Sequence, residues 1–194
     1  MFWVGKKHFV SLDDYEDRSM EVNPKDLIST ELREFLSTIP KDKISRYYIQ
    51  AIEYFKIEEY KKAVQILTKI LTLDINNTGA LFYRGQCFIK LEKFKNSIDD
   101  FTELLNLIPE FTEGYFYRGN ARSSLRTYSQ INDAISDYSH VIDKEPSNGI
   151  SLFLRGYCYL LLKKESLAFN DWKKSKEFGI AKEDEANWKR DFLE

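Results

Sequence analysis

The chain has 194 residues, of which 43% are apolar and 31% charged, so it is long enough to bury a core without disulfides or metal ions. Its 29 lysines and arginines against 31 aspartates and glutamates give a formal charge of -2, which offers no surplus positive field for nucleic acid or an anionic membrane. The longest apolar run, residues 157–162, is far shorter than the roughly 20 residues that span a membrane, so we expect a cytoplasmic protein without membrane insertion.

Residues 1–43 come before any repetition in the sequence. Residues 1–22 show no clear period, and their aromatic side chains predict an extended or partly ordered arm. From Asn23-Pro24 onward, apolar residues recur at helical spacing at Leu27, Ile28, Leu32, Phe35, Leu36 and Ile39. This pattern predicts a capped amphipathic helix that closes the exposed face of the first repeat.

Four copies of one two-helix pattern follow, over residues 44–77, 78–111, 112–148 and 149–182. A short motif of apolar residues followed by arginine and glycine occurs three times, ending at Gly85, Gly119 and Gly156. The glycines are 34 and 37 residues apart. Each of these copies has a second motif, in which an aromatic residue follows a small residue by four positions. The pairs are Ser97 and Phe101, Ala134 and Tyr138, and Ala168 and Trp172. The first copy is more divergent, with Ala51 and Ala63 at the small positions. These periods predict helical hairpins.

The joints between copies carry Pro, Gly or Asn, as expected just past the end of a helix. The third copy has three extra residues within 125–132, so its turn between helices is predicted to protrude. That turn is either a contact point or a tolerated insertion. Residues 183–194 contain Trp188, Phe192 and Leu193, which predict a C-terminal capping helix.

Residues 44–182 resemble the tetratricopeptide repeat (TPR) family. The resemblance rests on the 34-residue period, the small residues, the aromatics Tyr54, Phe88 and Tyr159, and Pro109 and Pro146. It implies an all-α, right-handed α-solenoid in which the first helix of each repeat lines a concave groove. Departures from the family pattern include Ile75 at a proline position and Arg122 at an aromatic one.

No residues suggest catalysis or a cofactor. The two histidines, His8 and His140, have no cysteine, serine or carboxylate at the spacing of a catalytic triad or metal site. The repeated glycines lie inside helical patterns beside arginine, unlike those of a phosphate-binding loop. Cys87 and Cys158 occupy equivalent places in non-adjacent copies and are predicted to remain reduced. We therefore expect a non-enzymatic protein without metal or cofactor.

Charged residues recur in pairs within the last three copies. Each of these copies has both an arginine and an aspartate, whereas the first copy has Gln50 and Ile66 in their places. Joint presence and joint loss predict an ion pair inside each repeat, namely Arg84 with Asp100, Arg118 with Asp137, and Arg155 with Asp171. The alternative is a row of arginines that binds acidic ligands.

The TPR resemblance implies a groove lined by pairs of side chains one helical turn apart. Transferred by position, these are Tyr48 and Ile52, Phe82 and Gln86, Phe116 and Asn120, and Phe153 and Tyr157. The lysine with which chaperone-binding members of the family clamp a terminal carboxylate is missing. Aromatic and amide side chains favour an apolar helix or an extended peptide as ligand. Alternatively, the rings belong to the core, or the N-terminal arm covers them.

Two functions fit this reading. One is an adaptor or scaffold that recruits a partner protein through the aromatic groove. The other is a dedicated chaperone or an immunity-type protein that masks one client protein. The sequence does not separate them.

Overall fold

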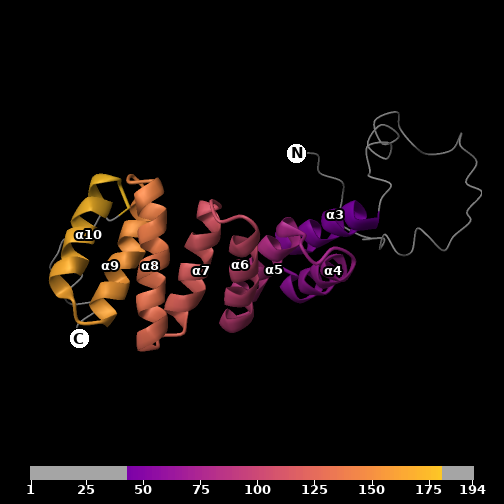
Figure 1. Ribbon diagram of the computed structural model, residues 1–194, viewed down its shortest axis with the longest axis horizontal. Coiled ribbons are helices and arrows are strands. Elements are labelled where there is room, and N and C mark those ends of the chain that lie inside the picture. The colour runs from indigo at the N-terminus through magenta and orange to yellow at the C-terminus, as the bar shows by residue number, and fades with distance from the viewer. Residues whose placement is uncertain (1–42, 181–194) are drawn as a thin grey trace, which may run out of the picture.

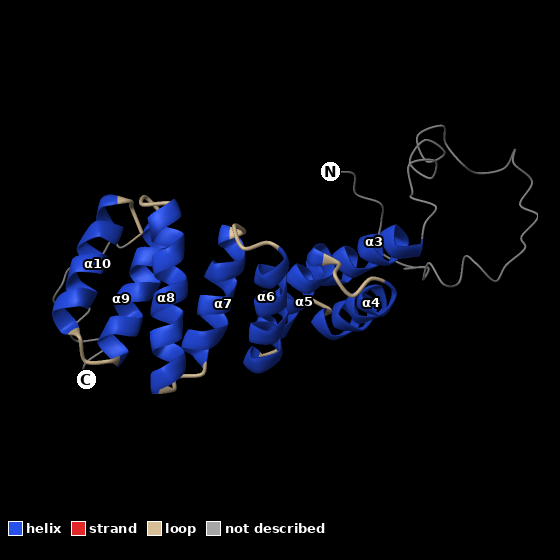
Figure 2. Ribbon diagram, viewed as in Figure 1, coloured by secondary structure: helices blue, strands red, loops and turns tan. Residues whose placement is uncertain are grey.

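The structure is a computed structural model that describes residues 43–180. Its helices are α3 (Lys43–Lys56), α4 (Tyr60–Leu73), α5 (Thr78–Lys90), α6 (Phe94–Leu107), α7 (Thr112–Ser124), α8 (Tyr128–Lys144), α9 (Gly149–Leu161) and α10 (Glu165–Glu177). No strand occurs among these residues (Figure 2). Apart from Lys43, the arm and capping helix expected over residues 1–43 lie outside the described range, as does the capping helix expected over 183–194.

The eight described helices form four hairpins that stand side by side in an elongated row (Figure 1). Each helix packs against the helices before and after it in the chain, and the first helices of neighbouring hairpins also touch, α3 against α5 and α5 against α7. Every hairpin therefore buries its apolar face against its neighbours, which is the packing of a solenoid. The predicted all-α solenoid architecture is confirmed.

Close contact between a glycine and an aromatic ring joins the two helices of a hairpin. A β-carbon added at Gly85 would lie 2.8 Å from the Phe101 ring, and one at Gly156 would lie 2.7 Å from the Trp172 ring. The same contact in the third hairpin is 3.0 Å, from Gly119 to Tyr138. The missing side chain thus creates the space that each fully buried ring fills.

The turn inside each hairpin contains one residue in the left-handed backbone region. These residues are Glu58, Glu92, Arg126 and Lys163, with φ between 52° and 63°. Each follows a first helix by two residues, where it reverses the chain direction. Because glycine, the usual residue for this conformation, is absent from all four positions, these left-handed turns could not be predicted from the sequence.

The protruding turn predicted for the third hairpin is wrong. Only residues 125–127 separate α7 from α8, the same three-residue connection as in the other hairpins. The extra residues instead lengthen α8 to 17 residues, against 14 for α6, and Thr127 caps the new first turn by accepting a hydrogen bond from the Gln130 amide. Three residues nearly complete a helical turn, so Ala134 and Tyr138 keep their buried orientation.

Candidate protein-binding surface

Among the residues predicted to line the groove, Tyr48, Phe82, Phe116 and Phe153 are all half-buried. Phe82 is packed against four rings, at centroid distances of 5.3 Å to Phe111 and 5.5 Å to both Tyr83 and Tyr117, with Phe101 at 6.1 Å. It therefore joins the core of the first two hairpins and of α7. Much of its surface is used inside the protein, as the core alternative expects.

The other three rings also make internal contacts, although fewer. Tyr48 meets Tyr83 edge-on at 5.8 Å, and burial together with the neighbouring Tyr83 raises the pKa of Tyr48 to about 12. Phe116 lies 6.4 Å from the Tyr138 ring, and Phe153 lies 6.3 Å from Trp172. Each of these rings therefore belongs partly to the core and partly to the surface.

Polar side chains one turn further along the first helices keep hydrogen-bonding groups available. Asn120 accepts a 2.7 Å hydrogen bond from the Tyr138 hydroxyl through Oδ1, while its amide nitrogen bonds to no described residue. Half-buried Gln86 makes no hydrogen bond to a described residue with its side chain. Arg126 Nη2 lies 3.5 Å from the Tyr157 hydroxyl, and Ile52, the remaining predicted residue of this row, is half-buried.

We call this surface the first-helix face. It consists of the eight residues that the TPR resemblance implies, Tyr48, Ile52, Phe82, Gln86, Phe116, Asn120, Phe153 and Tyr157. The rings of Phe82, Phe116 and Phe153 contact Phe101, Tyr138 and Trp172 of the second helices. The Gln86 amide and the Asn120 amide nitrogen are its hydrogen-bonding groups without a partner among the described residues.

Each repeated arginine forms a two-point contact with the aspartate of its own hairpin. Arg84 donates from Nε and Nη2 to the two carboxylate oxygens of Asp100, at 2.9 and 2.6 Å. Arg118 with Asp137 and Arg155 with Asp171 repeat this arrangement at 2.7 to 3.1 Å. All three aspartates are buried. This is the pairing expected when the carboxylate is supplied within the repeat.

The third nitrogen of each arginine reaches back to the preceding hairpin. Nη1 donates to a side-chain hydroxyl, from Arg84 to Thr68 at 3.2 Å and from Arg155 to Ser139 at 2.9 Å. From Arg118 to Thr102 the distance is 3.5 Å. Sequence reasoning missed these hydroxyls, although their recurrence at the repeat period was a usable signal. With aspartate and hydroxyl both engaged, the guanidinium groups are poorly placed to bind an acidic ligand.

The third hairpin adds a second cation to its aspartate. Arg122, which stands at an aromatic position of the repeat, donates to Asp137 Oδ2 at 2.7 Å. In the second hairpin, burial raises the pKa of the Asp100 carboxyl while the Arg84 guanidinium opposes the rise. Hydrogen bonding to Asp171 in turn raises the pKa of Arg155.

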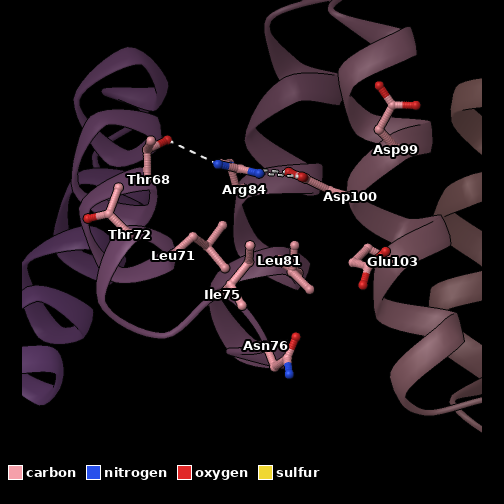
Figure 3. A pocket seen from close by; sticks show the side chains of 10 residues that line it. All are labelled: Thr68, Leu71, Thr72, Ile75, Asn76, Leu81, Arg84, Asp99, Asp100 and Glu103. Carbon is pink, nitrogen blue, oxygen red and sulfur yellow. Dashed lines mark hydrogen bonds and ion pairs between the residues drawn. The ribbon is translucent and has the colours of Figure 1, made fainter.

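An open groove of about 600 Å³ lies between α4 and α6, on the second-helix side of the first two hairpins. In Figure 3, Thr68 and Thr72 of α4 line one wall, Asp99 and Glu103 of α6 the other, and Arg84 lies between them. Its remaining lining residues are Leu71, Ile75, Asn76, Leu81 and Asp100. We call it the α4–α6 groove. The groove could not be predicted from the sequence, because it exists where the side chains between two neighbouring hairpins leave space unfilled.

The described residues offer few groups for chemistry. Between residues 43 and 180, no three histidine, cysteine or carboxylate side chains are grouped so as to hold a metal ion. Cys87 and Cys158 are free, buried thiols, and burial raises the pKa of both to about 12. None of the described helices combines the length and apolarity that crossing a membrane requires.

Comparison with solved structures places the fold. A structure titled "MamA 41-end from Desulfovibrio magneticus RS-1" is 18% identical, with a TM-score of 0.67 over 74% of this chain and 80% of that one. "MamA RS-1 ArsTM double mutant" is also 18% identical, with a TM-score of 0.67 over 76% of this chain and 82% of the other. "Crystal structure of MamA" is 19% identical, with a TM-score of 0.66 over 75% and 83% of the two chains.

No protein-family model matches the chain, and no curated protein is significantly similar to it in sequence. Since the identities to the solved structures are below 25%, the likeness shows the fold alone. The chain has a TPR-like helical-repeat fold.

Proposed function

We propose that the chain is a non-enzymatic protein-interaction scaffold that binds a peptide or helix of a partner protein along its first-helix face. The observation that carries the proposal is the side-chain amide of Gln86 and the amide nitrogen of Asn120, neither of which bonds to a described residue and each of which lies one turn beyond an aromatic ring. Amide groups without internal partners are free to bond a peptide backbone, and neighbouring rings supply apolar contact.

The internal contacts of the rings change how this proposal is best tested. Replacing Phe82 or Phe116 with alanine opens a cavity in the core as well as removing surface, so a loss of binding would not be separable from a loss of stability. Gln86 avoids this difficulty, since its side chain is half-buried and makes no hydrogen bond to a described residue.

The test compares two matched glutamine variants. A partner recovered from the source cells with the full chain as bait is purified, and its dissociation constant is measured by calorimetry with the wild type, Gln86→Ala and Gln65→Ala. Gln65 is exposed on α4, a second helix. Gln86→Ala is expected to weaken binding about tenfold, the size of one lost hydrogen bond, and Gln65→Ala to leave it unchanged. Equal affinities of the wild type and Gln86→Ala would reject the first-helix face.

A further inference from the structure

The α4–α6 groove lies at the first junction between hairpins, where the side chains fill less space than those at the next junction. At the next junction, Tyr115 takes the place of Leu81 and His140 that of Glu103, and the two rings stack at 3.8 Å. The Arg118 guanidinium lies 5.3 Å from the Tyr115 ring centroid, and the Lys144–Glu110 ion pair crosses the same junction at 2.9 Å. The second junction is therefore filled by a ring pair and an ion pair where the first junction has Leu81 and Glu103 in place of the rings.

The charge of the α4–α6 groove is negative. Arg84 and Asp100 neutralise each other, which leaves Asp99 and Glu103 as uncompensated charges among the residues that line it. Both are exposed, stand four residues apart on α6, and form no ion pair with a described residue. Figure 3 shows no lysine in the lining, so the α6 wall presents negative charge to solvent.

Apolar and hydroxyl groups complete the lining. Ile75, at the open end of the groove, is 76% exposed, a large fraction for an isoleucine that neighbouring elements leave uncovered. Leu71 and Leu81 are buried beneath it, and Thr68 and Thr72 stand on the wall opposite the carboxylates. A ligand that fits this lining brings aliphatic groups toward Ile75 and positive charge toward α6.

We propose that the α4–α6 groove is a second binding surface, which takes a segment of a partner protein in which lysine or arginine alternates with aliphatic residues. Its support is charge complementarity to Asp99 and Glu103, together with an exposed aliphatic side chain at the mouth. It does not rest on the first-helix face, because no residue of that face lines it.

The test uses a short fluorescein-labelled peptide in which lysine and leucine alternate, with a glutamate–leucine peptide as its counterpart. Binding to the full chain is followed by fluorescence anisotropy at about 0.1 M salt, where rim charges are still felt. The lysine peptide is expected to bind and the glutamate peptide not to bind. Gln86→Ala is expected to leave lysine-peptide binding unchanged, which separates this surface from the first-helix face.

Two double variants test where the peptide binds. Each removes two negative charges, so the two change the net charge of the protein equally. Asp99→Asn with Glu103→Gln is expected to weaken lysine-peptide binding about tenfold, as two rim ion pairs are lost. Asp143→Asn with Glu177→Gln removes two exposed carboxylates on α8 and α10 and is expected to leave the affinity as it was. Equal weakening by both pairs would show only general attraction to an acidic protein and overturn the proposal.

A third variant fills the groove with the side chains that the chain has at its second junction. Leu81→Tyr with Glu103→His copies the ring pair of the second junction and is expected to abolish peptide binding while circular dichroism shows an unchanged helix content. Full binding by this folded variant would overturn the proposal. Sedimentation gives a second outcome that would overturn it, namely self-association of the wild type that is lost in the Asp99→Asn, Glu103→Gln variant. The groove would then be occupied by a second copy of the chain.

Discussion

At the scale of single residues, the buried aspartates differ in how many arginines support them. Asp171 has a side chain only 2% exposed and is held by Arg155 alone among the described ion pairs. Asp137 is as deeply buried but contacts two arginines, Arg118 and Arg122. Removing one arginine therefore leaves a stranded carboxylate in the fourth hairpin and a paired one in the third.

Arg155→Ala is expected to lower the free energy of unfolding by about 3 kcal/mol, because it leaves a buried charge without compensation. Arg118→Ala is expected to lower it by about half as much, since Arg122 still neutralises Asp137. Urea unfolding curves for the two variants and the wild type measure both values. A larger loss for Arg118→Ala than for Arg155→Ala would show that Arg122 does not take over the pairing.

Buried thiols give the protein a dependence on alkaline pH. Burial raises the pKa of Cys87 and Cys158 from 9.0 to about 12, so between these values the thiols stay protonated when folded and ionise on unfolding. Unfolding then releases protons, and its free energy falls as pH rises, by up to about 1.4 kcal/mol per thiol and pH unit. Below pH 9 this effect is absent.

The prediction is that Cys158→Ala makes the fall in unfolding free energy between pH 9 and 11 shallower than in the wild type. An aromatic disulfide reagent is also expected to label neither thiol of the native protein at pH 8, and both in urea. Rapid labelling of the native protein would place at least one cysteine at the surface, contrary to the structure.

The sequence allowed part of this residue chemistry to be predicted. Arg84 and Asp100 appear together in the copies that have them, so their pairing followed from joint presence. The bond from Tyr138 to Asn120 did not, because it depends on the distance between two helices and not on any repeated pattern. That bond also reduces the hydrogen-bonding capacity of an amide that the repeat pattern assigned wholly to a ligand.

Among the structural elements, each hairpin turn has a residue other than glycine in a left-handed backbone conformation, which glycine adopts at lower energy. Glu92 has φ of 56°, a conformation that disfavours any residue with a β-carbon, and it is exposed. Its replacement by glycine removes that steric penalty and disturbs no buried contact. The gain is partly offset by the greater freedom of glycine in the unfolded chain.

Glu92→Gly is therefore expected to raise the free energy of unfolding by about 0.5 to 1 kcal/mol, seen as a higher melting temperature. Lys90→Gly serves as the control, because Lys90 is exposed and helical at the end of α5 and its replacement should be destabilising. A lower melting temperature for Glu92→Gly would mean that its side chain makes a contact that outweighs the backbone conformation.

Helix positions were predictable from the sequence because they follow from period and small residues, whereas the fate of an insertion was not. The extra residues of the third copy could lengthen either a turn or a helix. Thr127 supplies a cap and the insertion is close to one helical turn, so extending α8 preserves the packing of Tyr138. What decides between the two is whether the buried face of α8 keeps its orientation toward α7. The residue types around 125–132 do not show this.

At the scale of the whole molecule, four hairpins provide two different surfaces. The residues of the first-helix face were transferred from the TPR family, one pair to each of the equivalent helices α3, α5, α7 and α9. The α4–α6 groove is lined by Leu81 and Glu103, where the next junction has the bulkier Tyr115 and His140. Repetition can point to a surface shared by all hairpins, whereas it cannot predict a feature of one junction.

The most direct test of the proposed scaffold function is site-specific photo-cross-linking to the partner. Benzoylphenylalanine is placed at position 86, on the first-helix face, or at position 65, exposed on α4, and the cross-linked peptides are identified by mass spectrometry. Cross-links to one partner segment are expected from position 86 and none from position 65. Cross-links from position 65, with none from position 86, would contradict the assignment of the first-helix face as the principal binding surface.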